Sequence, residues 1–334
     1  MTLLITESDI EKCVTPFDVI EAEIEGFRQH GLGLAETLPR REIRIREKQL
    51  PHADPRQTKV AQGIAFLGES HVLTLQMMIN FPGVRVPPKK SLRYLIDTDT
   101  GDTLAVIDSL SLGASRTGAG GAVGARFLSR TDSDTVGMVG AGRQARVQLR
   151  FLTYVRKKIS RAYVFSRSAS HAATFAKEMS RELGIDISSL DDVEKMRDKI
   201  DIMVTTTPSF SPIVSSNALS PGMHVNIVGA DDPPKIELEA AALKKADKIV
   251  IAAEDSLLCG QFAIPMSRRE FSRNQIYGTI GEIIVGTKDG RTSGEEITIF
   301  HNPGLTLEDV ASGHRAYLNA KKKGLGKEIP DPFA

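Results

Sequence analysis

The sequence predicts an α/β protein that combines a doubly wound parallel sheet with a smaller α+β domain. At 334 residues the chain is longer than one ordinary hydrophobic core usually organises, so two domains are expected. In the second half, short apolar runs alternate with segments of helical period. This alternation is typical of parallel strands with helices covering both faces of the sheet.

The N-terminal portion predicts helix first and strands afterwards. Residues 8–31 open with a serine cap, carry apolar residues at helical spacing and end at a glycine, so one helix is expected. Residues 38–50 alternate charged and apolar side chains, as a half-buried strand does. The remaining expected elements of this portion are loops at 50–60 and 81–90, strands at 71–79, 91–98 and 100–108, and a long helix of small residues at 111–130.

The alternating half begins after residue 130. The strands expected there are 135–140, 161–166, 199–206, 224–228 and 247–252. The helices expected between them are 143–157, 169–183, 190–197 and 237–245. One more strand near 297–301, a turn and a helix over about 305–323 end the chain.

Composition excludes several classes of protein. The 43 basic and 42 acidic residues give a net charge of +1, so no global field attracts nucleic acid or an anionic membrane. No apolar run is long enough to span a bilayer, and the N-terminus lacks the pattern of a signal peptide. The two cysteines lie far apart and the seven histidines show no metal-ligand spacing, so a cytoplasmic protein without a metal site is expected.

A glycine loop carries the clearest functional signal. Gly140, Gly142 and Ala145 form a G-x-G-x-x-A pattern directly after an apolar strand and at the start of a helix. The first glycine permits a tight turn, the second lets the backbone approach a pyrophosphate, and the alanine permits close packing of helix and strand. In this context the loop predicts a Rossmann-type dinucleotide site, with a glycine turn that binds no ligand as the alternative.

The end of the next strand predicts which dinucleotide binds. An acid at this position would bind the ribose hydroxyl of NAD and repel a 2′-phosphate. The chain has Ser166, Arg167 and Ser168 there, and hydroxyls with a guanidinium suit a phosphate. NADP(H) is therefore the expected cofactor, NAD(H) is possible, and a solvated Arg167 is the structural alternative.

Two later strand ends face the same rim of the sheet. Thr205, Thr206 and Thr207 close one strand, where their hydroxyls could contact the cofactor or simply suit a strand. Asp231 and Asp232 follow the next strand, stiffened by two prolines. Asp231 is the expected acid–base group, provided that burial raises its pKa, whereas Asp232 is expected to be a turn residue.

Together these residues resemble the ornithine cyclodeaminase/mu-crystallin family, which includes an archaeal-type alanine dehydrogenase and ketimine reductases. The resemblance covers nearly the whole chain. It rests on Arg116-Thr117-Gly118, the GAGRQA loop, TTTPS, GADDPPK, GTIGEIIVG and ITIF…GLTLEDVA. It implies a Rossmann domain over 126–304, and a substrate-binding and dimerisation domain formed by 1–125 with 305–334. A homodimer is the implied assembly.

The resemblance also implies roles for individual residues. Arg116 would bind the substrate carboxylate, Arg41 is a second plausible contact, and Asp231 would handle protons at the amino-bearing carbon. The implied and expected cofactor contacts together are Thr117, Gly140, Gly142, Arg143, Gln144, Ala145, Ser166, Arg167, Ser168, Thr205, Thr206, Thr207, Gly229, Lys235 and Asn302.

The substrate half departs from the family pattern. Gln76 stands where the family has a lysine that helps to hold the carboxylate. Pro87-Pro88, Gln261 and Asn302-Pro303 replace other family residues. Losing a cation removes a charge-assisted contact of about 1.5–3 kcal/mol.

Three functions follow as hypotheses. The first is an enzyme that transfers hydride between a nicotinamide cofactor and a carbon–nitrogen bond of an amino acid or imine, as a cyclodeaminase, an amino acid dehydrogenase or an imine reductase. The second is an NADPH-dependent binding protein with little catalysis, and the third is an accessory subunit of an amine-metabolising system. Nucleic acid binding is disfavoured because no aromatic residues interleave with the basic run at 40–48.

Overall fold

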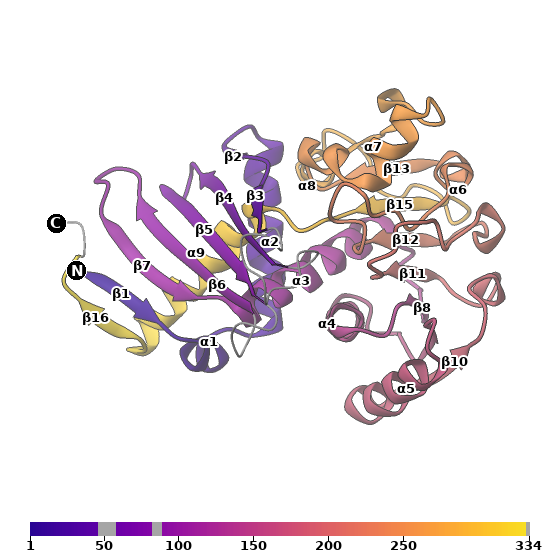
Figure 1. The fold of residues 1–334 in the computed structure, drawn as a ribbon, viewed down its shortest axis with the longest axis horizontal. Coiled ribbons are helices and arrows are strands. Elements are labelled where there is room, and N and C mark those ends of the chain that lie inside the picture. The colour runs from indigo at the N-terminus through magenta and orange to yellow at the C-terminus, as the bar shows by residue number, and fades with distance from the viewer. Residues whose placement is uncertain (46–57, 82–88, 332–334) are drawn as a thin grey trace. The chain divides into compact units, whose positions relative to one another are not determined.

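A computed structural model describes residues 1–45, 58–81 and 89–331, and its chain divides into two compact units. Unit one comprises residues 1–116 and 305–334, and unit two comprises residues 117–304. The boundary between the units falls inside one long helix, α3 (Leu110–Leu128). Figure 1 labels the elements of both units.

Unit one is built on a mixed sheet of eight strands. The strand order is β16-β1-β7-β6-β5-β4-β2, and β3 pairs with β4. Its strands are β1 (Thr2–Ile5), β2 (Ala35–Thr37), β3 (Arg41–Arg44), β4 (Lys59–Leu67), β5 (Val72–Asn80), β6 (Lys89–Asp97), β7 (Thr103–Asp108) and β16 (Lys327–Ile329). Only β1 and β7 run parallel among these pairs.

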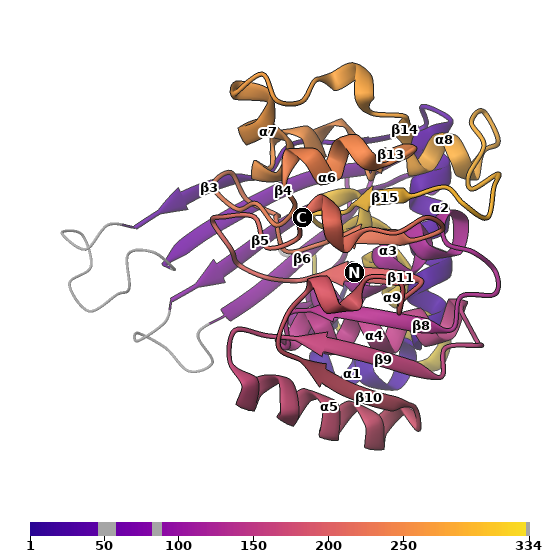
Figure 2. The ribbon, with the colours of Figure 1, turned by 90° about the vertical axis from the view of Figure 1, so that its right-hand side faces the viewer.

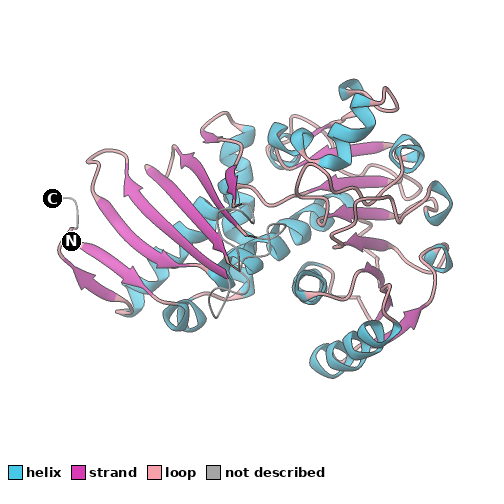
Figure 3. Cartoon of the chain, in the orientation of Figure 1, coloured by secondary structure: helices cyan, strands magenta, loops and turns pink. Residues whose placement is uncertain are grey.

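One face of this sheet is covered by helix. Alternate residues of β4 such as Ala61, Gly63 and Ala65 are buried, and α9 (Thr306–Lys323) packs against β4, β5 and β6 (Figure 3). Gly63 permits a close approach, because a Cβ there would lie 2.1 Å from the hydroxyl of Thr306. The opposite face carries half-exposed apolar side chains, as period-2 alternation requires.

The N-terminal helix expected as one element is two helices. The structure has α1 (Glu7–Cys13) and α2 (Pro16–Gly31). Val14 is extended, and Thr15 caps α2 with Pro16 in its first turn. Proline at that position starts a helix but cannot continue one, so the break is a local effect that the apolar spacing did not reveal.

Unit two is a doubly wound sheet in which every strand pair is parallel. The order is β10-β9-β8-β11-β12-β15-β13-β14. Figure 2 shows β8, β9 and β10 side by side in this order. Its strands are β8 (Thr135–Val139), β9 (Arg161–Phe165), β10 (Asp186–Leu190), β11 (Ile202–Thr205), β12 (His224–Ile227), β13 (Lys248–Ile251), β14 (Gly278–Thr279) and β15 (Thr298–His301). Its helices after α3 are α4 (Arg143–Val155), α5 (Ala169–Leu183), α6 (Ala240–Lys245), α7 (Gly260–Ser267) and α8 (Ile280–Ile284). The expected parallel Rossmann-type sheet is confirmed.

Two apolar cores lie on the two faces of the second sheet. Met138 and Val204 belong to one core, and Val139 and Met203 belong to the other. Neighbouring residues of a strand thus enter opposite cores, which explains why these strands read as continuous apolar runs.

Some expected elements differ from the observed ones. The expected helix at 190–197 is reduced to a single 3-10 turn at Glu194–Met196, preceded by the edge strand β10. The strand β4 was not expected, because its Ala and Gly residues have low β propensity. The loops expected at 50–60 and 81–90, with Pro87 and Pro88, fall largely outside the described residues.

Candidate functional site

The glycine loop of unit two has the geometry of a phosphate-binding turn. Gly140 adopts φ +113°, and a Cβ there would meet the Thr206 hydroxyl at 2.6 Å. Gly142 is the N-cap of α4, and a Cβ there would meet no atom within 4 Å. Ala145 is fully buried under the helix. The loop therefore offers an open backbone at the positive end of a helix dipole.

The side chains next to this loop differ in exposure. Arg143 is exposed on the first turn of α4, and Gln144 is half-buried. The carbonyl of Thr117 accepts a hydrogen bond of 2.8 Å from Gln148 Nε2, which ties α3 to α4. Thr117 thus contacts α4 through its backbone, and its expected cofactor contact stays a prediction.

A cavity of about 210 Å³ opens beside the loop. Its lining includes Gly140 and Gly142, Ser166 and Arg167 after β9, and Thr206 and Thr207 after β11. Ser168 caps α5 by accepting from the amide of His171, and His171 also lines the cavity. The lining contains no carboxylate, so the cavity suits an anionic group.

A buried carboxylate connects the two strand ends that follow. Glu237 is fully buried and accepts from the hydroxyls of Thr205 (2.7 Å) and Thr207 (2.8 Å). It also accepts from the amides of Thr207, Gly229 and Ala230. Burial raises the pKa of Glu237 to about 7, although these hydrogen bonds oppose the shift. The hydroxyls of Thr205 and Thr207 therefore serve Glu237 in this structure, and Gly229 provides the space for its carboxylate.

Asp231 lies on the loop after β12 and pairs with Lys235. The Lys235 Nζ donates to Asp231 Oδ1 at 2.6 Å, and the Asp231 side chain is 45% exposed. Burial would lower the pKa of Lys235, but the charge and hydrogen bond of Asp231 outweigh it and raise that pKa. The backbone carbonyl of Asp232 accepts from the Lys235 amide, which fits the expected turn. Asp231 is thus an accessible carboxylate with one cationic neighbour, and the burial expected around it is absent here.

The end of β15 faces the same loop. His301 is fully buried, its Nε2 lies 3.2 Å from the Ala230 carbonyl, and burial lowers its pKa to about 4. A neutral His301 therefore contacts the backbone of Ala230, the residue before Asp231. Asn302 is buried, and its Oδ1 accepts from the Gly304 amide at 3.0 Å.

In unit one, Arg116 belongs to a buried cluster of charges on Asp309. Arg116 Nε and Arg93 Nη2 both donate to Asp309 Oδ1, at 2.9 and 2.6 Å. Arg40 Nη2 donates to Asp309 Oδ2 at 2.6 Å. Burial would raise the pKa of Asp309, but Arg116, Arg93 and Arg40 hold it at about 2.

Two more acids belong to the cluster. Glu308 Oε2 lies 3.5 Å from Arg116 Nη1. Glu23 of α2 is fully buried, and burial together with the charge of Glu308 raises its pKa well above the ordinary value. Burial and the charge of Glu308 therefore favour the neutral form of Glu23.

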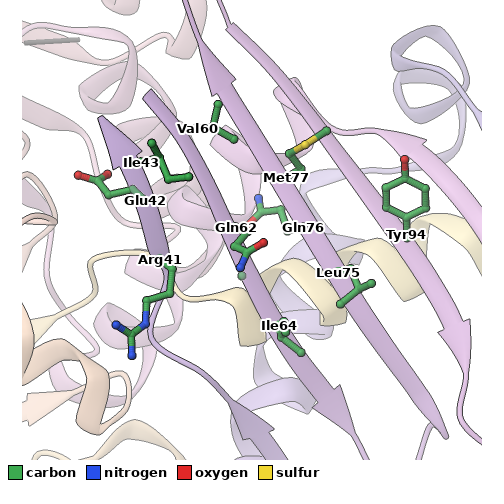
Figure 4. Close-up of a pocket in the computed structure, with 11 residues that line it drawn as sticks. Arg41, Glu42, Ile43, Val60, Gln62, Ile64, Leu75, Gln76, Met77 and Tyr94 are labelled. Atoms are coloured by element: carbon green, nitrogen blue, oxygen red, sulfur yellow. The ribbon is translucent and has the colours of Figure 1, made fainter. Parts of the chain in front are cut away.

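The other two expected substrate residues lie on the sheet. Arg41 is exposed on β3, whereas its neighbour Arg40 reaches the cluster. Gln76 of β5 is 4% exposed and pairs in register with Arg93 of β6 and Gly63 of β4. Arg41 and Gln76 both line a cavity of about 310 Å³ whose side chains come from β3, β4, β5 and β6 (Figure 4). Gln62, Ile64, Leu75 and Tyr94 also line it.

Several residues of these sites were missed at the sequence level. Arg93 carried a readable signal, because it is a charged residue whose alternate neighbours in the strand, Ser91 and Leu95, are buried. Glu237, Glu308 and Asp309 had no comparable signal. Each is an acid near a helix start, where exposed acids are common.

The described residues offer neither a metal site nor a membrane-spanning helix. Within 1–45, 58–81 and 89–331, no group of three or more His, Cys, Asp or Glu side chains could hold a metal ion. No described helix is long and apolar enough to cross a membrane.

Comparison with known proteins agrees with this geometry. The chain is 32% identical over 330 residues to an alanine dehydrogenase of Archaeoglobus fulgidus, covering 98% of each chain. Its structure matches the Δ1-pyrroline-2-carboxylate reductase of Thermococcus litoralis in complex with NADH and L-proline, with a TM-score of 0.88, 30% identity and coverage of 98% and 100%. It matches an archaeal alanine dehydrogenase dimer with bound NAD, with a TM-score of 0.89, 33% identity and coverage of 98% and 99%. The ornithine cyclodeaminase/mu-crystallin family matches residues 2–324, and the chain belongs to that family.

Proposed function

We propose that the protein is an NAD(P)-dependent oxidoreductase that transfers hydride at a carbon–nitrogen bond of an amino acid or a cyclic or open imine. The observation that carries this proposal is the glycine loop: Gly140 at positive φ and an uncovered Gly142 at the start of α4, beside a cavity without carboxylates. Relatives named alanine dehydrogenase and pyrroline-2-carboxylate reductase support the reaction class.

The cofactor would supply the hydride chemistry, and this chain would orient and protonate the substrate. Its residues fit that task. The open amides of the loop suit a pyrophosphate, and Thr206 and Thr207 line the adjoining cavity. Arg116 would hold the substrate carboxylate with help from Arg40, and Asp231 would exchange a proton with the reacting nitrogen or activate water.

NADP(H) is the preferred cofactor in this proposal. Ser166 and Arg167 line the cavity, and the capping Ser168 starts α5 beside them. A guanidinium and hydroxyls at a helix N-terminus favour a 2′-phosphate. The two solved relatives were described with NADH and NAD, so NAD(H) remains the alternative cofactor.

The assembly we propose is a homodimer formed through the uncovered face of the first sheet. That face is apolar. Leu75 on it is 40% exposed. The half-exposed side chains on the same face of the sheet are Val60, Ile64, Leu73, Met77 and Tyr94. A patch of this kind marks an interaction surface, and an archaeal alanine dehydrogenase relative is a dimer. Leu75→Glu should give a monomer by light scattering, whereas Leu318→Glu, on the exposed side of α9, should leave the dimer intact.

The proton-transfer role is tested by Asp231→Asn, with Asp232→Asn as the matched control. Asp231→Asn should lower turnover by about 100-fold or more with the affinity for NADPH unchanged, because general acid–base catalysis contributes ~10²–10⁴-fold. Asp232→Asn should keep turnover. Unchanged turnover in Asp231→Asn across amino acids and imines would refute the assignment.

A second function is an NADPH-binding protein with little catalysis. Two observations favour it: Gln76 carries no charge at its buried position, and Asp231 is paired with Lys235. It predicts tight NADPH binding with no oxidation of the cofactor by any imine. The role as an accessory subunit of an amine-metabolising system stays a prediction, which co-purification from the source cell would test. A cytoplasmic location also stays a prediction.

A further inference from the structure

Arg93 is the largest fully buried side chain among the described residues. It lies on β6, far in sequence from α9, and its guanidinium makes three contacts with that helix. Nη2 donates to Asp309 Oδ1 (2.6 Å), and Nη1 donates to the Asp309 carbonyl (3.1 Å) and to Ser312 Oγ (3.0 Å). Burying a guanidinium is costly, so this arrangement calls for a reason.

Arg93 competes with Arg116 for one oxygen atom. Both guanidiniums donate to Oδ1 of Asp309, while Arg40 occupies Oδ2. Without Arg93, Asp309 could give Oδ1 wholly to Arg116 and neutralise it more completely. With Arg93 present, one carboxylate is divided among three cations, which raises the positive potential at Arg116 and Arg40.

The acids around the cluster offset only part of this charge. Glu308 Oε2 lies 3.5 Å from Arg116 Nη1. Burial together with the charge of Glu308 raises the pKa of the fully buried Glu23, which favours its neutral form. A positive potential of this kind in a buried region favours an added anion.

We propose that Arg93 is a positioning residue that sets the affinity of this cluster for carboxylate-bearing substrates, by drawing Asp309 away from Arg116 and Arg40. This inference rests on the proposed function, which assigns the substrate carboxylate to Arg116 and Arg40. Arg93 has no exposed surface and acts through Asp309 rather than by touching the substrate.

The neighbouring strand offers a way to separate charge from packing. Gln76 stands directly opposite Arg93 in the β5–β6 register, on the same face of the sheet. A lysine at position 76 can place a cation one strand away from the lost guanidinium. The double variant Arg93→Met/Gln76→Lys therefore restores the charge but not the side chain, and Gln76→Lys alone measures what the new lysine adds by direct contact with the carboxylate.

Binding of pyrrole-2-carboxylate, a planar carboxylate that cannot be reduced, tests the inference by titration calorimetry on the NADPH-loaded protein. Arg93→Met should weaken this binding about 10-fold, with NADPH affinity unchanged. The double variant should regain most of the lost affinity. Arg156→Met removes another buried guanidinium, which bonds Ser129 and backbone carbonyls in unit two, and it should bind the carboxylate as the wild type does.

Wild-type affinity in a folded Arg93→Met protein would overturn the inference, as would a wild-type protein that does not bind the carboxylate. An affinity lost in Arg93→Met and not regained in the double variant would assign Arg93 to packing and would also overturn it. A wild-type protein that binds the carboxylate but reduces no imine would refute the proposed function and leave this inference standing. Steady-state kinetics add a second readout: KM for the carboxylate substrate should rise in Arg93→Met more than kcat falls.

Discussion

The two units offer different kinds of candidate anion site. In unit two the candidate features are backbone: an open glycine turn and the N-terminus of α4. In unit one they are side chains. Arg93 of β6, Arg116 of α3 and Arg40 before β3 all donate to one carboxylate, that of Asp309 on α9. A backbone site is encoded in a few adjacent residues, whereas a side-chain cluster needs segments more than 200 residues apart, such as Arg93 and Asp309.

The largest expected effect is on the stability of unit one. Asp309→Asn leaves the buried Arg93 and Arg116 and the half-buried Arg40 without their shared anion. Breaking a buried pair costs about 3–5 kcal/mol of unfolding free energy. Urea unfolding measures this loss. Asp99→Asn, whose side chain is 65% exposed, should have little effect. Equal stability of both variants would contradict the account of the cluster.

Acid unfolding tests the charge of Asp309 in the same cluster. The folded pKa of Asp309 is about 2, below the ordinary 3.8. A depressed carboxyl pKa stabilises the fold above the ordinary value, and this contribution, about 2 kcal/mol, is lost as pH falls from about 4 towards 2. The difference in stability between the wild type and Asp309→Asn should therefore shrink over that window. A difference in stability that does not change with pH would mean that the ion pairs do not lower the pKa of Asp309.

The next effect is on the backbone site of unit two. Gly140→Val adds a side chain at φ +113°, where a Cβ already lies 2.6 Å from the Thr206 hydroxyl. NADPH affinity, followed by fluorescence titration, should fall by about 100-fold or more because the turn can no longer form. Gly294→Ala, whose Cβ meets no atom within 4 Å, is the control. Retained affinity in Gly140→Val would remove the loop from the cofactor site.

A smaller effect concerns Glu23, the buried acid of unit one. Because its pKa is raised above 4.5, Glu23 costs no stability below that pH and costs more as pH rises towards the folded pKa. Glu23→Gln stays neutral, so at pH 7 to 8 it should be more stable than the wild type. The advantage should vanish near pH 4 in denaturant titrations. An advantage independent of pH would show that Glu23 is ionised in the folded protein.

The smallest effect is on cofactor choice. Arg167→Ala should weaken NADPH about 10-fold and leave NADH nearly unchanged, because the guanidinium would serve only the 2′-phosphate. Arg181→Ala, in the last turn of α5, the helix that follows Arg167, should change neither affinity. Equal loss of affinity for NADPH and NADH would mean that Arg167 does not act through the 2′-phosphate.

The sequence predicted unit two better than unit one for a physical reason. The glycine loop, its strand and its helix are contiguous, so roles for Gly140, Gly142 and Ala145 follow from the order of residues alone. The partners of Arg116 could not be predicted in this way, because Arg40, Arg93 and Asp309 meet only through the packing of α9 on the sheet. The resemblance implied a role for Arg41, and the ion pair between its neighbour Arg40 and Asp309 could not be predicted from the sequence for the same reason.

The most direct test of the account is steady-state oxidation of NADPH with two matched imines, Δ1-pyrroline-2-carboxylate and 1-pyrroline, which lacks the carboxylate. If the protein reduces imines whose carboxylate it binds through arginine, the first imine should be reduced with a kcat/KM about 100-fold or more above that of the second. Equal rates with both imines, or no oxidation of NADPH with any carboxylate-bearing imine or with keto acids plus ammonia, would contradict the account.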